Sequence, residues 1–148
     1  MEGKEFGPVV IGKLLNIGGM LERKANQLLC KFDLNQQQYS ILFEIQKAGK
    51  VNQKSMVNRL LLEKAHVSKI IKKLYGMGLI TKTVAPGDKR SFWLSITPKG
   101  TDTVKQCRKV TAAWNEKWVG EIPQNQRTAV IDDLALLQKL FKDNIRND

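Results

Sequence analysis

The stretch that decides the fold runs from Val67 to Gly100 and reads VSKIIKKLYGMGLITKTVAPGDKRSFWLSITPKG. Its first part places apolar residues at i, i+3, i+4 and i+7, a spacing that predicts one buried helix face, formed by Val67, Ile70, Ile71 and Leu74. We expect this helix to end at Gly76 or Gly78, because glycine tolerates the left-handed conformation that closes a helix. The opposite face of the same helix is rich in lysine.

A β-hairpin is predicted directly after this helix. Residues 79–84 read as an extended strand, and Ala85-Pro86-Gly87-Asp88 supplies a tight turn. The next strand alternates as a half-buried strand does, with Phe92, Leu94 and Ile96 on one face and Ser91, Trp93 and Ser95 on the other. A lysine-rich helix beside a basic hairpin is typical of a winged helix-turn-helix, whose helix enters the major groove of DNA while its wing lies near the neighbouring minor groove.

The positive charge of the chain is concentrated in the same region. The formal net charge is +11, and residues 50–109 carry 14 Lys or Arg against three acidic residues, so the remaining residues are neutral on balance. This excess favours a polyanionic partner, double-stranded DNA above all. A solvated basic surface without a partner is the alternative.

Further helices are predicted before this stretch. A first helix runs from about Val9 to Leu29, and a second begins after Asn35, whose side chain can cap it while Gln38 reaches back to the Asn35 amide. A short third helix opens after Asn52, and a turn at residues 61–63 then completes the spacing of a helix-turn-helix.

Two more helices are predicted after the hairpin. One should begin at Thr97-Pro98 and run to about Val119, and the last should begin after Pro123. The last helix has apolar residues outside a narrow seam, namely Ile131, Leu136 and Leu140. This pattern fits a helix buried on two sides of one core, or a helix that pairs with a second subunit.

These elements predict a mainly α fold with a small β-hairpin wing, in one domain over residues 1–148. Its winged helix-turn-helix lobe spans about 35–100, and the helices at about 6–31 and 98–146 are the candidates for dimerisation. No run approaches about 18 apolar residues and the first residues lack the features of a signal peptide, so we expect a cytoplasmic protein.

Catalytic and metal chemistry are not expected. Cys30 and Cys107 are too few for a disulfide framework and too far apart for a metal motif, so we interpret both first as small core residues. His66 is the only histidine, and no nucleophile motif surrounds it. We therefore expect neither an enzyme nor a bound cofactor.

The chain resembles, over nearly its whole length, the MarR family of bacterial transcription regulators. The family's wing signature of G-L-I, D-x-R and L-T-x-x-G is similar to Gly78-Leu79-Ile80, Asp88-Lys89-Arg90 and the residues 94–100. Residues 34–39 and Val67-Ser68-Lys69 resemble the starts of the family's second helix and recognition helix. The resemblance implies a regulator, most often a repressor, whose homodimer is held by the first and last two helices and binds a pseudo-palindromic operator. It also implies release by a small aromatic or anionic effector or by thiol oxidation.

The DNA-contacting residues follow from a helical wheel. The groove side of the lysine helix should carry Ala65, His66, Ser68, Lys69, Lys72 and Lys73. Lys69 and Lys72 are candidates for base contacts or phosphate contacts, Ser68 is adaptable, and Ala65 suits a thymine methyl group. Lys64 and Lys73 are expected at the phosphate backbone.

In the wing, a guanidinium at the hairpin tip suits a narrow minor groove, so Arg90 is the predicted contact and Lys89 assists it. Asp88 either positions Arg90 or a neighbouring amide, or is simply a turn residue with a local hydrogen bond.

Three residues are candidates for signal sensing. Trp114 and Trp118 lie one turn apart and either wall an effector pocket or belong to the core. Cys30 lies next to Lys31, whose charge favours a thiolate, and only loosely matches the cysteine of the family's peroxide-sensing branch. The rival function from another class is a winged-helix module that binds an acidic protein partner.

Overall fold

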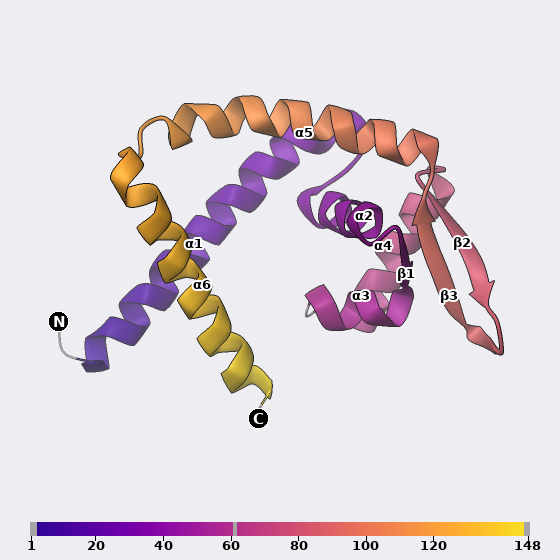
Figure 1. The fold of residues 1–148 in the computed structure, drawn as a ribbon, viewed down its shortest axis with the longest axis horizontal. Helices are drawn as coiled ribbons and strands as arrows, with labels where there is room; N and C mark the ends of the chain where they lie inside the picture. Colours follow the sequence, from indigo (N-terminus) through magenta and orange to yellow (C-terminus); the bar gives the residue numbers. More distant parts are fainter. Residues whose placement is uncertain (1–2, 61, 147–148) are drawn as a thin grey trace. The chain divides into compact units, whose positions relative to one another are not determined.

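The computed structural model describes residues 3–60 and 62–146 and is mainly helical with one small sheet (Figure 1). Leu61, in the predicted turn at residues 61–63, lies outside the described residues. The chain divides into two compact units, residues 1–111 and residues 112–148. The helices are α1 (Gly3–Leu29), the 3-10 turn η1 (Cys30–Phe32), α2 (Gln36–Ala48), α3 (Gln53–Leu60), α4 (Lys64–Gly76), α5 (Pro98–Val119) and α6 (Gln124–Arg146). The strands are β1 (Lys50–Asn52), β2 (Ile80–Ala85) and β3 (Asp88–Ile96).

The start of α2 has the predicted capping box. The Asn35 side chain accepts a hydrogen bond from the Gln38 amide, and the Gln38 side chain accepts one from the Asn35 amide, both at 2.9 Å. The end of α1 is joined to this point, because the Gln36 amide donates to Asn26 Oδ1 at 2.7 Å. Gly49 closes α2 with a φ of 73°, in the left-handed region that glycine adopts without strain.

The core of the first unit lies between α2, α4 and the sheet. The predicted face of α4 is buried, with Val67, Ile70, Ile71 and Leu74 at most 4% exposed. The same cluster includes Ile41, Leu42 and Ile45 of α2, Met56 of α3 and Leu94 of β3. The spacing read from the sequence therefore identifies the packed side of α4 correctly.

The hairpin is part of a three-stranded antiparallel sheet in the order β1-β3-β2. Strand β1 is an element that the sequence pattern does not predict, and it pairs Val51 with Leu94. Asn52, at its end, accepts a hydrogen bond from the Lys54 amide at 2.8 Å and so opens α3 as expected. The predicted mainly α fold with a small β wing is confirmed, and the sheet has one strand more than the predicted hairpin.

Gly100 fixes how α5 leaves the sheet. A Cβ atom at this position would lie 2.1 Å from the carbonyl oxygen of Leu79 and 2.7 Å from Cγ1 of Ile96. The Gly100 amide donates to Thr97 Oγ1 at 3.0 Å, and the Thr97 hydroxyl donates to the Gly78 carbonyl at 2.7 Å. Thr97 therefore caps α5 and ties its start to the chain before β2.

Some sequence expectations need correction. Helix α1 begins at Gly3, earlier than the expected Val9. Cys30 is exposed in η1 and is not a core residue, whereas Cys107 is buried as expected. The aromatic pair is not a core pair either, because Trp118 is 42% exposed.

The second unit leaves the apolar residues of α6 uncovered. Among the described residues of this helix, seven large apolar side chains are between 41% and 67% exposed: Val130, Ile131, Leu134, Leu136, Leu140, Phe141 and Ile145. Leu137 is half-buried, and the other side chains of residues 124–145 are exposed. Within its own unit, α6 is therefore not a helix buried on two sides.

Candidate nucleic-acid interface

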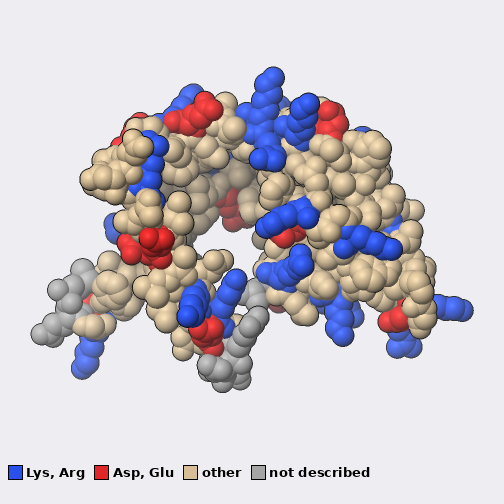
Figure 2. Space-filling model, in the orientation of Figure 1, with Lys and Arg blue, Asp and Glu red and all other residues tan. Residues whose placement is uncertain are grey.

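Helix α4 separates its apolar and cationic residues onto two faces. Opposite the buried face, five of the predicted interface residues are exposed: Lys64, Ala65, His66, Lys69 and Lys72. Figure 2 shows Lys and Arg side chains outnumbering acidic ones over the visible face of α2–α4 and the sheet. A cationic, solvent-facing helix surface attracts a polyanion by long-range electrostatics.

Ser68 differs from its neighbours because it is half-buried. Its hydroxyl oxygen accepts a hydrogen bond of 2.8 Å from Nε2 of Gln53, the first residue of α3. Oε1 of Gln53 is buried and has no hydrogen-bond partner among the described residues. The Gln53–Ser68 bond therefore joins the starts of α3 and α4 at the predicted groove surface.

Two other predicted residues of α4 make contacts inside the first unit. His66 Nε2 is hydrogen-bonded to Oε1 of Gln37 on α2. Lys73 donates to the carbonyl oxygen of Asp33 at 2.8 Å and to Oε1 of Gln38 at 3.3 Å, and it lies 3.5 Å from Asp33 Oδ1. The Lys73 ammonium is thus directed at the start of α2.

The tip of the wing is built around Gly87 and Asp88. Gly87 has a φ of 83°, which a tight turn requires and glycine supplies. Asp88 Oδ1 accepts a 2.9 Å hydrogen bond from the backbone amide of Arg90. This one contact is both a local hydrogen bond of the turn and a contact that positions the Arg90 backbone. This carboxylate shapes the turn, and the side chains of Lys89 and Arg90 are both exposed.

A cleft of about 590 Å³ lies between the helices and the wing. One wall, called the helical wall, is formed by α3, α4 and the last residue of β1: Asn52, Gln53, Lys54, Val57, Asn58, Lys64 and Ser68. Its wing wall is formed by Lys82, Asp88, Arg90, Ser91 and Phe92. Four of these side chains are cationic and one is acidic.

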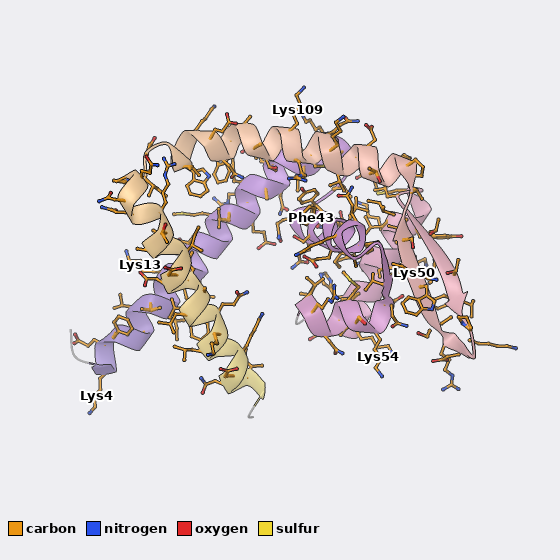
Figure 3. The ribbon with its side chains drawn as sticks, viewed as in Figure 1. Lys4, Lys13, Phe43, Lys50, Lys54 and Lys109 are labelled. Carbon is orange, nitrogen blue, oxygen red and sulfur yellow. The ribbon has the colours of Figure 1, made fainter. Side chains whose placement is uncertain are left out.

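The cleft contains cations that the helical-wheel prediction misses. Lys54 belongs to α3, and Lys82 belongs to β2, where its ammonium lies 4.0 Å from the centre of the Phe92 ring. A wheel drawn for α4 alone cannot identify them, because they come from other elements. In the sequence, the only signal for them is the excess of basic residues over 50–109. That excess does not select the cleft, because it also includes Lys109, which projects from α5 away from the sheet (Figure 3).

The candidate sensing residues Cys30, Trp114 and Trp118 are not among the described residues that line this cleft. Cys30 lines a second cavity of about 320 Å³ with Asn26, Asp33, Leu34, Asn35, Gln38 and Lys73. Burial raises the pKa of the Cys107 thiol to about 11. The rings of Trp114 and Trp118 are 6.1 Å apart, and Trp118 donates to Asn115. Sensing by Cys30 or by the tryptophans stays a prediction.

Two kinds of site are not found in the described part of the chain. Within residues 3–60 and 62–146, no group of three or more His, Cys, Asp or Glu could hold a metal ion. Over the same residues, no helix combines the length and the apolar character needed to cross a membrane.

Comparisons with known proteins agree with this geometry. A sequence model of the MarR family matches residues 34–92, from the residue before the capping box to Phe92 of the wing. The transcriptional regulator SarZ of Staphylococcus saprophyticus is 31% identical over 80 residues, which are 54% of this chain. The chain aligns with about half of SarZ, 55% of its length.

Two solved structures share the fold across most of both chains. BldR from Sulfolobus solfataricus has a TM-score of 0.83 and 17% identity over 94% of this chain and 99% of BldR. A mutant MarR from E. coli complexed with operator DNA has a TM-score of 0.71 and 19% identity over 93% of this chain and 94% of MarR. This chain is therefore similar to regulators of the MarR family in the sequence of residues 34–92 and in its fold over most of its length.

Proposed function

We propose that this protein is a transcription regulator that binds double-stranded DNA sequence-specifically as a dimeric repressor. The observation that carries the proposal is α4, which buries its apolar face while Lys64, Lys69 and Lys72 face solvent beside a wing tipped by Lys89 and Arg90. A helix of this kind fits the major groove, and the hairpin reaches the adjacent minor groove. MarR-family members are transcription regulators and not enzymes, and the related E. coli structure holds operator DNA.

The exposed residues are proposed to make either base contacts or phosphate and minor-groove contacts, according to the chemistry of each side chain. Lys69 and Lys72 can donate to guanine O6 and N7, and Ala65 can contact a thymine methyl group. Lys64, at the start of α4, suits a phosphate, and Arg90 suits an electronegative minor groove. Lys73 is left out of the proposed interface, because its ammonium is already hydrogen-bonded to Asp33 and Gln38.

The proposed dimer rests on the apolar side chains of the terminal helices. In α1, as in α6, seven large apolar residues are exposed: Phe6, Val9, Ile11, Leu15, Ile17, Met20 and Leu21. Exposed apolar surface of this extent marks an interaction site, and closed two-fold symmetry is the commonest way in which identical chains bury it. A second copy of this chain is therefore the proposed partner.

A binding-site selection from random duplex DNA tests the proposal. The two α4 helices of a two-fold dimer enter successive major grooves, so the recovered site should hold inverted half-sites centred about 10 base pairs apart. Recovery of an asymmetric motif contradicts the dimeric readout. Failure to bind any duplex, with retained binding to an acidic protein, would favour the rival interaction module.

Two variants separate base contacts from phosphate contacts in the same selection. Lys69→Ala should relax the preference at one symmetric pair of positions, because it removes a base donor. Lys64→Ala should weaken all sequences alike and flatten the salt dependence. A Lys69→Ala profile with the same shape as the parent's would assign Lys69 to the backbone.

A further inference from the structure

The cleft between the helices and the wing lies where a duplex would place one of its strands. The major and minor grooves of DNA are separated by a single sugar-phosphate strand, so a protein that fills adjacent grooves with a helix and a hairpin must receive that strand between them. In this chain the space between α4 and the wing is the cleft of about 590 Å³. The inference rests on the proposed function, since it specifies how the same surface binds DNA.

The charges of the cleft suit a phosphodiester strand. Lys54 and Lys64 line its helical wall, and Lys82 and Arg90 line the wing wall. The one carboxylate, Asp88, accepts the Arg90 amide. Among the described residues, no acidic side chain lies within ion-pair distance of these four cations. Their charge is therefore available to a ligand.

The two walls are fixed to one another by side-chain hydrogen bonds. Asn52 Nδ2 donates to Ser91 Oγ, which joins the end of β1, directly before α3, to the wing. Gln53 Nε2 donates to Ser68 Oγ, which joins α3 to α4. These bonds fix the width of the cleft in the free protein. Ordering the two walls on binding DNA therefore costs little free energy.

Lys82 is the best-positioned cation of the cleft. It is half-buried on β2, opposite the core residue Leu94, while Lys54, Lys64 and Arg90 are exposed. Its ammonium lies 4.0 Å from the centre of the Phe92 ring, a cation–π geometry that holds it against the wing wall. An ordered lysine loses less side-chain entropy on binding a phosphate than a free one does.

We propose that the cleft is the seat of the DNA strand between the two grooves, and that Lys82, held by Phe92, is its phosphate anchor. Lys82 then contributes to affinity without reading sequence. Phe92 acts through Lys82 as a positioning residue.

The test measures the affinity for a mixed-sequence 30-base-pair duplex across a series of potassium chloride concentrations. Lys82→Ala should flatten the slope of log affinity against log salt by about 1.8 for the dimer, about 0.9 for each subunit. Lys82→Arg keeps the charge and should keep the slope. Lys105→Ala is the matched control, because Lys105 is an exposed lysine of α5 outside the cleft and its removal should change nothing.

Variants of Phe92 provide a second, independent test. Phe92→Leu should lower the affinity about two- to fivefold at fixed salt while the slope stays, because the charge remains and only its position is lost. Phe92→Tyr keeps a ring and should restore the parent's affinity. Circular dichroism melting of each variant confirms that it is folded.

Methylphosphonate substitution then locates the contact on a site recovered by selection. Neutralising the phosphate between the two grooves should weaken the parent and leave Lys82→Ala unaffected, since the partner of that phosphate is already gone. If the parent binds DNA and folded Lys82→Ala keeps the parent's slope, this inference is wrong and the proposed function stands. If the parent protein binds no duplex DNA, both this inference and the proposed function are wrong.

Discussion

The ammonium of Lys73 donates a 2.8 Å hydrogen bond to the carbonyl oxygen of Asp33, and this contact ties the C-terminal half of α4 to the turn before α2. Asp33 has a φ of 57°, a left-handed conformation that aspartate tolerates better than most residues. The two residues are forty positions apart, so Lys73 joins the helix proposed to read DNA to the segment that follows α1.

Lys73→Ala should therefore lower stability rather than DNA affinity. The loss of a partly exposed hydrogen bond predicts a decrease of about 0.5–1.5 kcal/mol in the free energy of unfolding, measured by urea titration. The salt dependence of DNA binding should match that of the parent, because the ammonium is not free for phosphate. A flattened slope with unchanged stability would return Lys73 to the interface.

Gly100→Ala should destabilise the first unit strongly. The new Cβ atom would lie 2.1 Å from the Leu79 carbonyl oxygen, so α5 or the chain before β2 must shift. Overpacking of this kind costs about 1–3 kcal/mol, to be read from the thermal midpoint. Gly76→Ala is the control, because a Cβ atom there meets nothing within 4 Å, and it should leave the midpoint unchanged or raise it. Equal midpoints for the two variants would contradict the close approach.

The two cysteines should differ sharply in reactivity. Cys30 is exposed, whereas burial raises the pKa of the Cys107 thiol to about 11, so about one Cys107 in a thousand is a thiolate at pH 8. At pH 8 iodoacetamide should modify Cys30 in the native protein and Cys107 only after unfolding, as peptide mass spectrometry can show. Native labelling of Cys107 at a similar rate would show that this part of the core opens.

Arg90→Ala should weaken binding to a selected site by about 1–3 kcal/mol without changing the thermal midpoint. Arg90 is exposed, and its backbone amide donates to Asp88. Among the described residues its guanidinium has no hydrogen-bond or ion-pair partner, so the substitution removes no such contact. Fluorescence anisotropy on labelled duplex measures the affinity. An unchanged affinity, or an unfolded variant, would remove Arg90 from the proposed interface.

The protein should sediment as a dimer at low micromolar concentration. Ile131 is 67% exposed in the single chain, so Ile131→Glu should place a charge in the proposed subunit contact and shift the equilibrium towards monomer. Lys139→Glu on the same helix is a control for charge alone. A species of 16.8 kDa for the parent at tens of micromolar would rule out the dimer.

The sequence predicts the elements that local physics decides. The buried face of α4 and the Asn35–Gln38 capping box depend on residues within two turns of each other, and both are confirmed. Strand β1 is missed because a three-residue strand with one inward side chain, Val51, shows no alternation. It exists only because it pairs with β3, some forty residues later.

In the candidate site, too, features decided within one segment are predicted, and features that depend on the packing of distant segments are not. The exposure of Lys69 and Lys72 follows from the period of one helix. By contrast, Lys82 lines the same cleft as Lys54 and Lys64 only because of how the sheet packs against α3 and α4. The exposure of Cys30 likewise depends on the way η1 turns the chain after α1. No pattern within one segment contains these relationships.

The hydrogen bonds from Asn52 to Ser91 and from Gln53 to Ser68 have a mechanical consequence. They join the wing and α4 to two adjacent residues, the last residue of β1 and the first of α3, so we expect the two elements proposed to contact DNA to move together. In the proposed dimer, a signal that releases DNA would then act by changing the spacing or tilt between the winged helices of the two subunits.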